Sequence, residues 1–150
     1  MRYVRDGCSK RPGALKETLV SVTTRLAGWW GEWIARRALQ REGWRILGRR
    51  VRPDGRHEID LIARDGEVLV FIEVKMRRSE DFGPPASAVN PAKRRALSQA
   101  ALRYLKRLPS RPAYWRFDIV EVIGVPFSPY PTVRRIENAF PLAERYVREF

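Results

Sequence analysis

The feature that most constrains the fold is a turn signal, Asp65-Gly66, between two stretches of alternating side chains. These stretches are His57–Arg64 (HEIDLIAR) and Glu67–Lys75 (EVLVFIEVK). An Asp-Gly pair suits the two positive-φ positions of a type I′ turn, so we predict a β-hairpin with its loop at 65–66. The hairpin places two strands side by side and determines which side chains share a face of the sheet.

With this loop, Asp60 lies opposite Phe71 and Glu58 lies opposite Glu73. Any loop of even length about the same centre leaves the same side chains on each face of the sheet, because side chains alternate with a period of two. The acidic face then carries Glu58, Asp60, Glu73 and Lys75. The other face carries an apolar stripe suited to a core: Leu61, Ala63, Val68, Val70, Ile72 and Val74.

Helical and strand patterns flank the hairpin along the chain. Small and apolar residues recur at helical spacing over Thr24–Glu42 and Ala92–Leu108, whereas Trp44–Val51 and Trp115–Val125 alternate as strands do. Short turns between the first three strands predict an antiparallel meander, and the helix before the last strand predicts a crossover to a parallel neighbour. We therefore expect an α/β fold with a mixed β-sheet flanked by helices, in the order helix, three-strand meander, helix, strand.

The length of 150 residues fits one domain with its own core. We expect a basic N-terminal arm over residues 1–22, followed by a single domain over residues 23–150. Cys8 and His57 are the only Cys and His, which excludes a disulfide framework and metal sites built from cysteines or several imidazoles. The chain has no apolar run long enough to span a membrane and no secretory signal, so a cytoplasmic protein without membrane contact is predicted.

Three carboxylates and an ammonium on one sheet face need a physical reason. Opposed like charges destabilise a ladder, and one carboxyl group would titrate upward unless a cation shared the site. Mg²⁺ or Mn²⁺ would resolve the conflict, because both ions prefer oxygen ligands. In this interpretation Asp60, Glu73 and the backbone carbonyl of Val74 hold the ion, while Lys75 orients or activates the attacking water. The chemistry is that of a metal-assisted phosphodiester hydrolase.

Two further acids have a catalytic and a plain interpretation. Glu32, at the border of the apolar arc of the first helix, would contact a metal-bound water or a second ion, and Glu58 would assist at the same site. In the plain interpretation Glu32 is a surface residue, and Glu58 belongs to a solvated face with Lys75 and Arg56 as partners.

Positive charge favours the catalytic interpretation. The chain has 30 Lys and Arg against 17 Asp and Glu, a net charge of +13, and residues 82–117 contain no acid. A cationic helix without acids is suited to binding phosphates. We predict nucleic-acid contacts at Lys93, Arg94, Arg95, Arg103, Lys106 and Arg107, and beside the acidic site at Arg77, Arg78, Arg49 and Arg50.

The acidic motif resembles that of the PD-(D/E)XK nuclease superfamily, which has an acid on one strand, Glu-x-Lys on the next and often a Glu on the preceding helix. Asp60, Glu73-Val74-Lys75 and Glu32 stand at those places. The wider pattern resembles the YraN-like family of bacterial predicted endonucleases, which is similar to archaeal Holliday-junction resolvases. The likeness rests on Gly31-Glu32 with Ala35, Glu58-Ile59-Asp60-Leu61-Ile62-Ala63, Val70-Phe71-Ile72-Glu73-Val74-Lys75, Phe82-Gly83, Ala88-Val89, Lys93, Tyr104-Leu105, Arg116-Phe117-Asp118 and Asn138-Ala139-Phe140.

The resemblance implies a restriction-endonuclease-like fold, a divalent metal and a DNA substrate that includes branched forms such as Holliday junctions. It also implies a homodimer, since two strands must be cut. His57 stands where the family usually has Gly, and Arg50 stands where it usually has Asn. Neither departure removes an expected metal ligand, and His57 falls on the strand face opposite Asp60, which favours a core or surface role.

Two functions from different classes follow from these observations. The first is a metal-dependent DNA endonuclease that uses Asp60, Glu73 and Lys75, assisted by Glu32 and Glu58. The second is a non-catalytic nucleic-acid-binding module that has the same fold and basic surface. RNA stays open as a substrate, because the chemistry of acids and lysine does not distinguish the 2′-hydroxyl.

Overall fold

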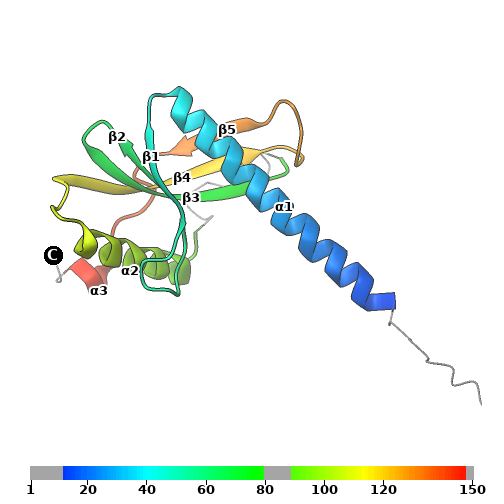
Figure 1. The fold of residues 1–150 in the computed structure, drawn as a ribbon, viewed down its shortest axis with the longest axis horizontal. Helices are drawn as coiled ribbons and strands as arrows, with labels where there is room; N and C mark the ends of the chain where they lie inside the picture. Colours follow the sequence, from blue (N-terminus) through cyan, green and yellow to red (C-terminus); the bar gives the residue numbers. More distant parts are fainter. Residues whose placement is uncertain (1–11, 80–88, 148–150) are drawn as a thin grey trace, which may run out of the picture.

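The structure is a computed structural model that describes residues 12–79 and 89–147, with side chains described from residue 22 onward. The predicted loop over Ser79–Pro91 lies largely outside these residues, as does the first half of the predicted arm. In chain order the elements are α1 (Pro12–Arg41), β1 (Arg45–Val51), β2 (Ile59–Asp65), β3 (Val68–Arg77), α2 (Pro91–Arg107), β4 (Tyr114–Ile123), β5 (Thr132–Ile136) and α3 (Glu144–Val147) (Figure 1).

The five strands form one mixed sheet in the order β1-β2-β3-β4-β5. β1, β2 and β3 are antiparallel neighbours, whereas β4 runs parallel to β3. α2 connects β3 to β4, as the crossover prediction required. The α/β fold with a mixed sheet and flanking helices is therefore confirmed.

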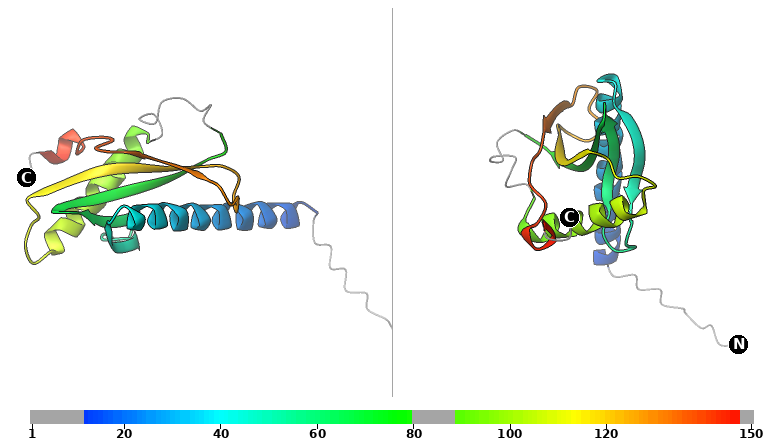
Figure 2. Two further views of the ribbon diagram at one scale, coloured as in Figure 1. Left: turned by 90° about the horizontal axis from the view of Figure 1, so that it is seen from above. Right: turned by 90° about the vertical axis from the view of Figure 1, so that its left-hand side faces the viewer.

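Each face of the sheet packs against one long helix (Figure 2). Leu61, Val70 and Ile72 of the predicted apolar stripe are buried with Trp30 and Leu39, the latter two from α1. The opposite face buries residues of β2, β3 and β4 against α2, and it includes Ile62, Phe71, Leu97, Ala101 and Phe117. The acidic residues therefore belong to the face that α2 covers.

Small residues let α1 approach the sheet closely. A Cβ atom built at Gly31 would lie 2.4 Å from Sδ of Met76, so a side chain there would force Met76 to move. α1 begins at Pro12, earlier than predicted, and its N-terminal part extends beyond the sheet (Figures 1 and 2). None of the helices in the described part of the chain has both the length and the apolar character needed to cross a membrane.

The hairpin register differs from the prediction. Asp65 pairs with Val68, so the loop consists of Gly66 and Glu67 and not of Asp65 and Gly66. Gly66 has φ of 57°, and a glycine at the first loop position is the preference of a type II′ turn. The predicted pairs Asp60 with Phe71 and Glu58 with Glu73 are therefore wrong, because Phe71 pairs with Ile62. The shift moves each partner by two residues, so the division into two faces is preserved.

β5 was not predicted, because the pattern of the C-terminal region is weak. Its sequence, TVRRI, has two arginines in five residues, and it forms an edge strand antiparallel to β4. Arginine side chains on a solvent-accessible edge dilute the alternation of apolar residues that indicates a strand.

A buried ionic cluster ties β4 to β5 and to the hairpin. Asp118 has no exposed surface, and it accepts hydrogen bonds from Nε of Arg116 and the backbone N–H of Asn138, both at 2.9 Å. Arg116 also donates to Asp65 at 2.9 Å. Burial lowers the pKa of Arg116, but its hydrogen bonds to Asp118 and Asp65 outweigh this and raise the pKa overall. These contacts support a structural role for Asp118.

We expect Asp118→Ala to lower the free energy of unfolding by about 3–5 kcal/mol, because it leaves the Arg116 guanidinium buried without its main partner. Urea denaturation measures the change. Glu137→Ala is the matched control, because it removes an exposed carboxylate that lies 3.6 Å from the same guanidinium, and it should cost less than about 1 kcal/mol. Equal losses in the two variants would contradict the structural role.

Candidate active site

Two carboxylates meet where the ladder between β2 and β3 ends. Leu61 faces Ile72 in the observed register, so the next pair along these strands is Asp60 and Glu73. Oδ2 of Asp60 accepts the backbone N–H of Val74 at 2.8 Å, and a side chain therefore acts as the hydrogen-bond partner of that strand position. The structure thus brings together Asp60, Glu73 and the backbone of Val74, the three proposed ligands.

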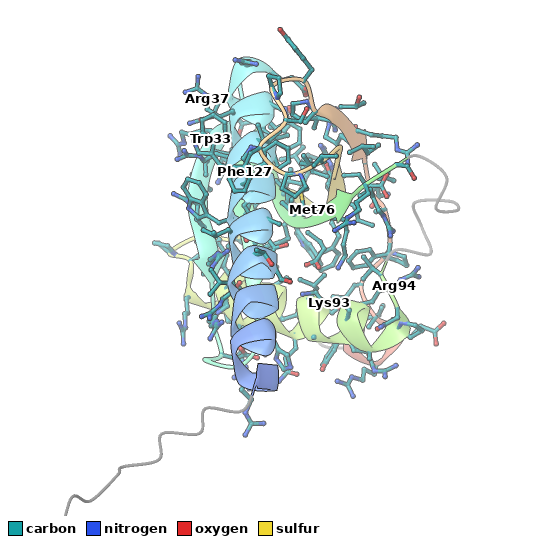
Figure 3. All side chains as sticks on the ribbon, turned by 90° about the vertical axis from the view of Figure 1, so that its right-hand side faces the viewer. Trp33, Arg37, Met76, Lys93, Arg94 and Phe127 are labelled. Atoms are coloured by element: carbon teal, nitrogen blue, oxygen red, sulfur yellow. The ribbon has the colours of Figure 1, made fainter. Side chains whose placement is uncertain are left out.

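Two lysines from different elements approach Glu73. Nζ of Lys75 lies 2.8 Å from Oε1, and Nζ of Lys93 lies 3.1 Å from Oε2. Lys75 follows on β3, whereas Lys93 comes from the first turn of α2 (Figure 3). Asn90 caps this helix by accepting the backbone N–H of Lys93 at 2.9 Å. Lys75, predicted to be catalytic, therefore contacts Glu73, and so does Lys93, which was predicted only to bind phosphate.

The pKa of Asp60 reflects this crowding. Burial raises it most and the charge of Glu73 raises it further, whereas the N–H of Val74 and the charge of Lys93 lower it. The charge of Glu32 adds a smaller increase, and the result is a pKa of about 7. A carboxyl group whose pKa lies this close to physiological pH is typical of functional sites. A nearby cation would lower this pKa and keep the carboxylate charged.

Glu32 is buried on α1 and forms a two-pronged ion pair with Arg50 of β1. Nε and Nη2 of Arg50 each lie 2.8 Å from a different carboxylate oxygen. Arg50 has φ of 46°, in the left-handed region that an Asn adopts more readily than an Arg. The hydrogen bond to Glu32 raises the pKa of Arg50 against the effect of burial, and the charges of Glu32, Glu58 and Asp60 add to the increase. Arg50 therefore links Glu32 electrostatically to the acidic site.

Glu58 and His57 occupy the connection before β2. Glu58 accepts a hydrogen bond from Nε of Arg52 at 2.8 Å and does not face Glu73 as predicted. The ring of His57 pairs with Asp54, whose backbone partners are the N–H groups of Arg56 and His57. Burial raises the pKa of Asp54, but its hydrogen bonds from His57 and Arg56 lower it to about 2. His57 thus shapes the loop and takes no part in the acidic site.

The predicted phosphate-binding residues lie in several places. Arg103 and Arg107 of α2 line a surface hollow of about 670 Å³ together with Arg52 and Arg56 from the connection before β2. Arg94 donates to the backbone carbonyl of Val89 and lies over the ring of Phe140. Arg49, Arg78, Arg95 and Lys106 are exposed. Asp54 also lines this hollow, so its four arginines share the surface with one acid.

The donor set fits a hard divalent cation. Oε2 of Glu73 is buried and receives no well-directed hydrogen bond from the described residues, although Lys93 lies within ion-pair distance. Asp60 and the carbonyl of Val74 would complete a set of oxygen ligands, and Mg²⁺ commonly takes one or two carboxylates with water and phosphate. No three His, Cys, Asp or Glu side chains within residues 12–79 and 89–147 are grouped to hold a metal. An ion here would therefore rest on two carboxylates.

A second ionic cluster on the same face was not predicted from the sequence. Glu121 of β4 is buried between Arg77 of β3 and Arg134 of β5. The alternation in β4 could have located Glu121 on the inner face, but its partner Arg134 lies in the strand that was not predicted.

Comparison with known proteins places these residues in a family context. The uncharacterised protein family UPF0102 matches residues 31–122. A UPF0102 protein of Symbiobacterium thermophilum is 48% identical over 117 residues, which cover 78% of this chain and 98% of that protein. A UPF0102 protein of Geobacter metallireducens is 45% identical over 75% of this chain and 90% of its own. A UPF0102 protein of Pelobacter propionicus is 41% identical over 140 residues, 89% of this chain and 99% of its own.

We expect the free energy of unfolding of the metal-free protein to fall as the pH rises from the ordinary aspartate pKa of 3.8 toward 7. In that interval folded Asp60 holds a proton that the unfolded chain has released, so raising the pH disfavours the folded state. Asp60→Asn keeps an acceptor for Val74 and removes the titration. Urea denaturation in a chelating buffer should show the variant gaining stability over the wild type between about pH 5 and about pH 8. A constant difference across this range would contradict the prediction.

Proposed function

The chain belongs to the uncharacterised protein family UPF0102, the YraN-like group that its motifs resemble, and we propose that it is a divalent-metal-dependent endonuclease that hydrolyses phosphodiester bonds in DNA. The observation that carries the proposal is the placement of Asp60 beside Glu73 with Lys75 at 2.8 Å from that glutamate. The raised pKa of Asp60 supports it, because a cation would stabilise the charged carboxylate, which burial and then the charge of Glu73 disfavour.

Each residue has a distinct part in the proposed reaction. Asp60, Glu73 and the carbonyl of Val74 would hold Mg²⁺ or Mn²⁺, which polarises a phosphate oxygen and acidifies bound water. The ammonium of Lys75 orients the attacking water and offsets charge that develops on the phosphate. Lys93 offers a second ammonium on the other side of Glu73. Glu32, with its charge balanced by Arg50, supports the site from α1.

Net charge supports a nucleic-acid substrate. A charge of +13 attracts a polyanion, and the hollow lined by Arg52, Arg56, Arg103 and Arg107 supplies four guanidinium groups, of which Arg52 also pairs with Glu58. We further propose that branched DNA such as a Holliday junction is cut, and that two copies act together so that two strands are cleaved. Sedimentation of the protein alone and with a four-way junction tests the homodimer.

A second candidate is a non-catalytic nucleic-acid-binding module. The observation that favours it is that Glu73 already contacts two lysines, so its charge is balanced without a metal ion. Binding that depends on salt and is indifferent to metal, with no cleavage of duplex, single-stranded or four-way DNA, would support this candidate. Cleavage of RNA in place of DNA would preserve the reaction and change the substrate.

We expect Asp60→Asn and Lys75→Ala each to reduce Mg²⁺-dependent cleavage at least about 100-fold, because each removes a group that acts at the reacting phosphate. Supercoiled plasmid, linear duplex, single-stranded and four-way DNA are the substrates, with gel electrophoresis as the measurement. Glu67→Gln is the control, since this exposed acid lies in the hairpin loop. Cleavage by both site variants at the wild-type rate would reject the assignment.

We expect Mn²⁺ to stabilise the wild type by about 2–3 kcal/mol when free metal exceeds its Kd about 100-fold. Asp60→Asn should lose this gain, because one of only two carboxylate ligands becomes neutral. Thermal unfolding with increasing Mn²⁺ measures the effect without any substrate. Equal stabilisation of the two proteins would show that Asp60 is not a ligand of the metal.

A further inference from the structure

A row of charged residues crosses the sheet next to the acidic site. Lys75 of β3 pairs with Glu121 of β4, and Glu121 pairs with Arg134 of β5. Paired residues on neighbouring strands project from the same face. The row therefore begins at the lysine that contacts Glu73 and continues, on the face that α2 covers, to the edge of the sheet.

One fully buried carboxylate orients two arginines in this row. Oε2 of Glu121 accepts hydrogen bonds from Nε of Arg134, at 2.8 Å, and from its Nη2. Nε of Arg77 lies 3.6 Å from Oε1, beyond hydrogen-bond distance, and this nitrogen is buried without a hydrogen-bond partner among the described residues. Glu121 thus fixes Arg134 firmly and draws Arg77 toward the same point.

The two guanidinium groups carry more charge and more donors than Glu121 can satisfy. Each guanidinium has five N–H donors in a rigid plane, so the edges that do not face Glu121 are available to another acceptor. The side chains of Arg77 and Arg134 are 27% and 42% exposed, whereas that of Glu121 is 2% exposed. A buried ion pair adds little stability over apolar residues of the same volume, so stability alone does not explain this cluster.

We propose that Arg77 and Arg134, held by Glu121, form a binding site for a second backbone phosphate of the nucleic-acid strand that is cut beside Lys75. This inference rests on the proposed function and deepens it. Two strand spacings separate Lys75 from Arg134, which places the two positions about 10 Å apart. Two N–H groups of one guanidinium can bind two oxygens of one phosphate. The site would therefore fix the direction in which the nucleic-acid strand crosses the sheet.

The test is binding of a fluorescently labelled DNA duplex in a chelating buffer, measured by anisotropy over a range of salt concentrations. Arg77→Ala and Arg134→Ala should each weaken binding about ten-fold at physiological salt. Each should also lower the slope of log affinity against log salt by about one, because one phosphate contact is lost. Arg134→Lys keeps the charge, so it should restore the slope and recover part of the affinity.

Arg41→Ala is the matched control, because this exposed arginine ends α1 on the opposite side of the sheet. Circular dichroism confirms that each variant is folded. The proposal would be overturned if Arg77→Ala and Arg134→Ala both kept the wild-type slope. It would also be overturned if Arg41→Ala lowered the slope as much as they do.

Failure of this inference differs from failure of the proposed function. If the wild type cleaves DNA with Mg²⁺ while the arginine variants keep the wild-type slope, the second phosphate site is rejected and the nuclease stands. If the arginine variants lose slope while no DNA or RNA is cleaved, the phosphate site stands on a binding module. If no DNA or RNA is cleaved and the arginine variants keep the wild-type slope, both proposals are rejected.

Discussion

The repulsion between two carboxylates at the end of one β-ladder is the constraint on which the rest of the site depends. Asp60 and Glu73 lie directly after the pair of Leu61 and Ile72 in β2 and β3, in a position where burial and then the charge of Glu73 raise the pKa of Asp60. Opposed acids in a ladder cost stability, so neighbouring groups must compensate. The compensating groups come from elements far apart in sequence, so α2, β3 and α1 all contribute side chains around the acidic site.

Each compensating side chain is positioned by a specific feature of the backbone. Lys93 reaches Glu73 from the first turn of α2, a turn capped by Asn90. Arg50 reaches Glu32 from β1 through a left-handed backbone position. The crossover from β3 to β4 therefore does more than pair two parallel strands, because it brings the helix that it contains against the acid of the preceding strand.

Much of this arrangement could be predicted from local patterns, since alternation determines which side chains share a face. The predicted pairs were wrong, but the prediction that Asp60 and Glu73 share one face was preserved, because a shift of the loop from Asp65-Gly66 to Gly66-Glu67 leaves each side chain on the same face. The contact of Lys93 with Glu73 could not be predicted, because it depends on where a helix docks. β5 was missed because arginines interrupt its pattern, and its ionic partner Glu121 was missed with it.

The hydrogen bond from Val74 to Asp60 has an evolutionary consequence. This carboxylate accepts the N–H of Val74 beyond the last backbone pair between β2 and β3, so the residue serves the sheet whether or not any reaction takes place. A relative without the proposed activity would still need a hydrogen-bond acceptor at position 60 for the backbone of β3. Divergence at Lys75, whose ammonium contacts the side chain of Glu73, is therefore the more informative sign that a relative lacks the proposed chemistry.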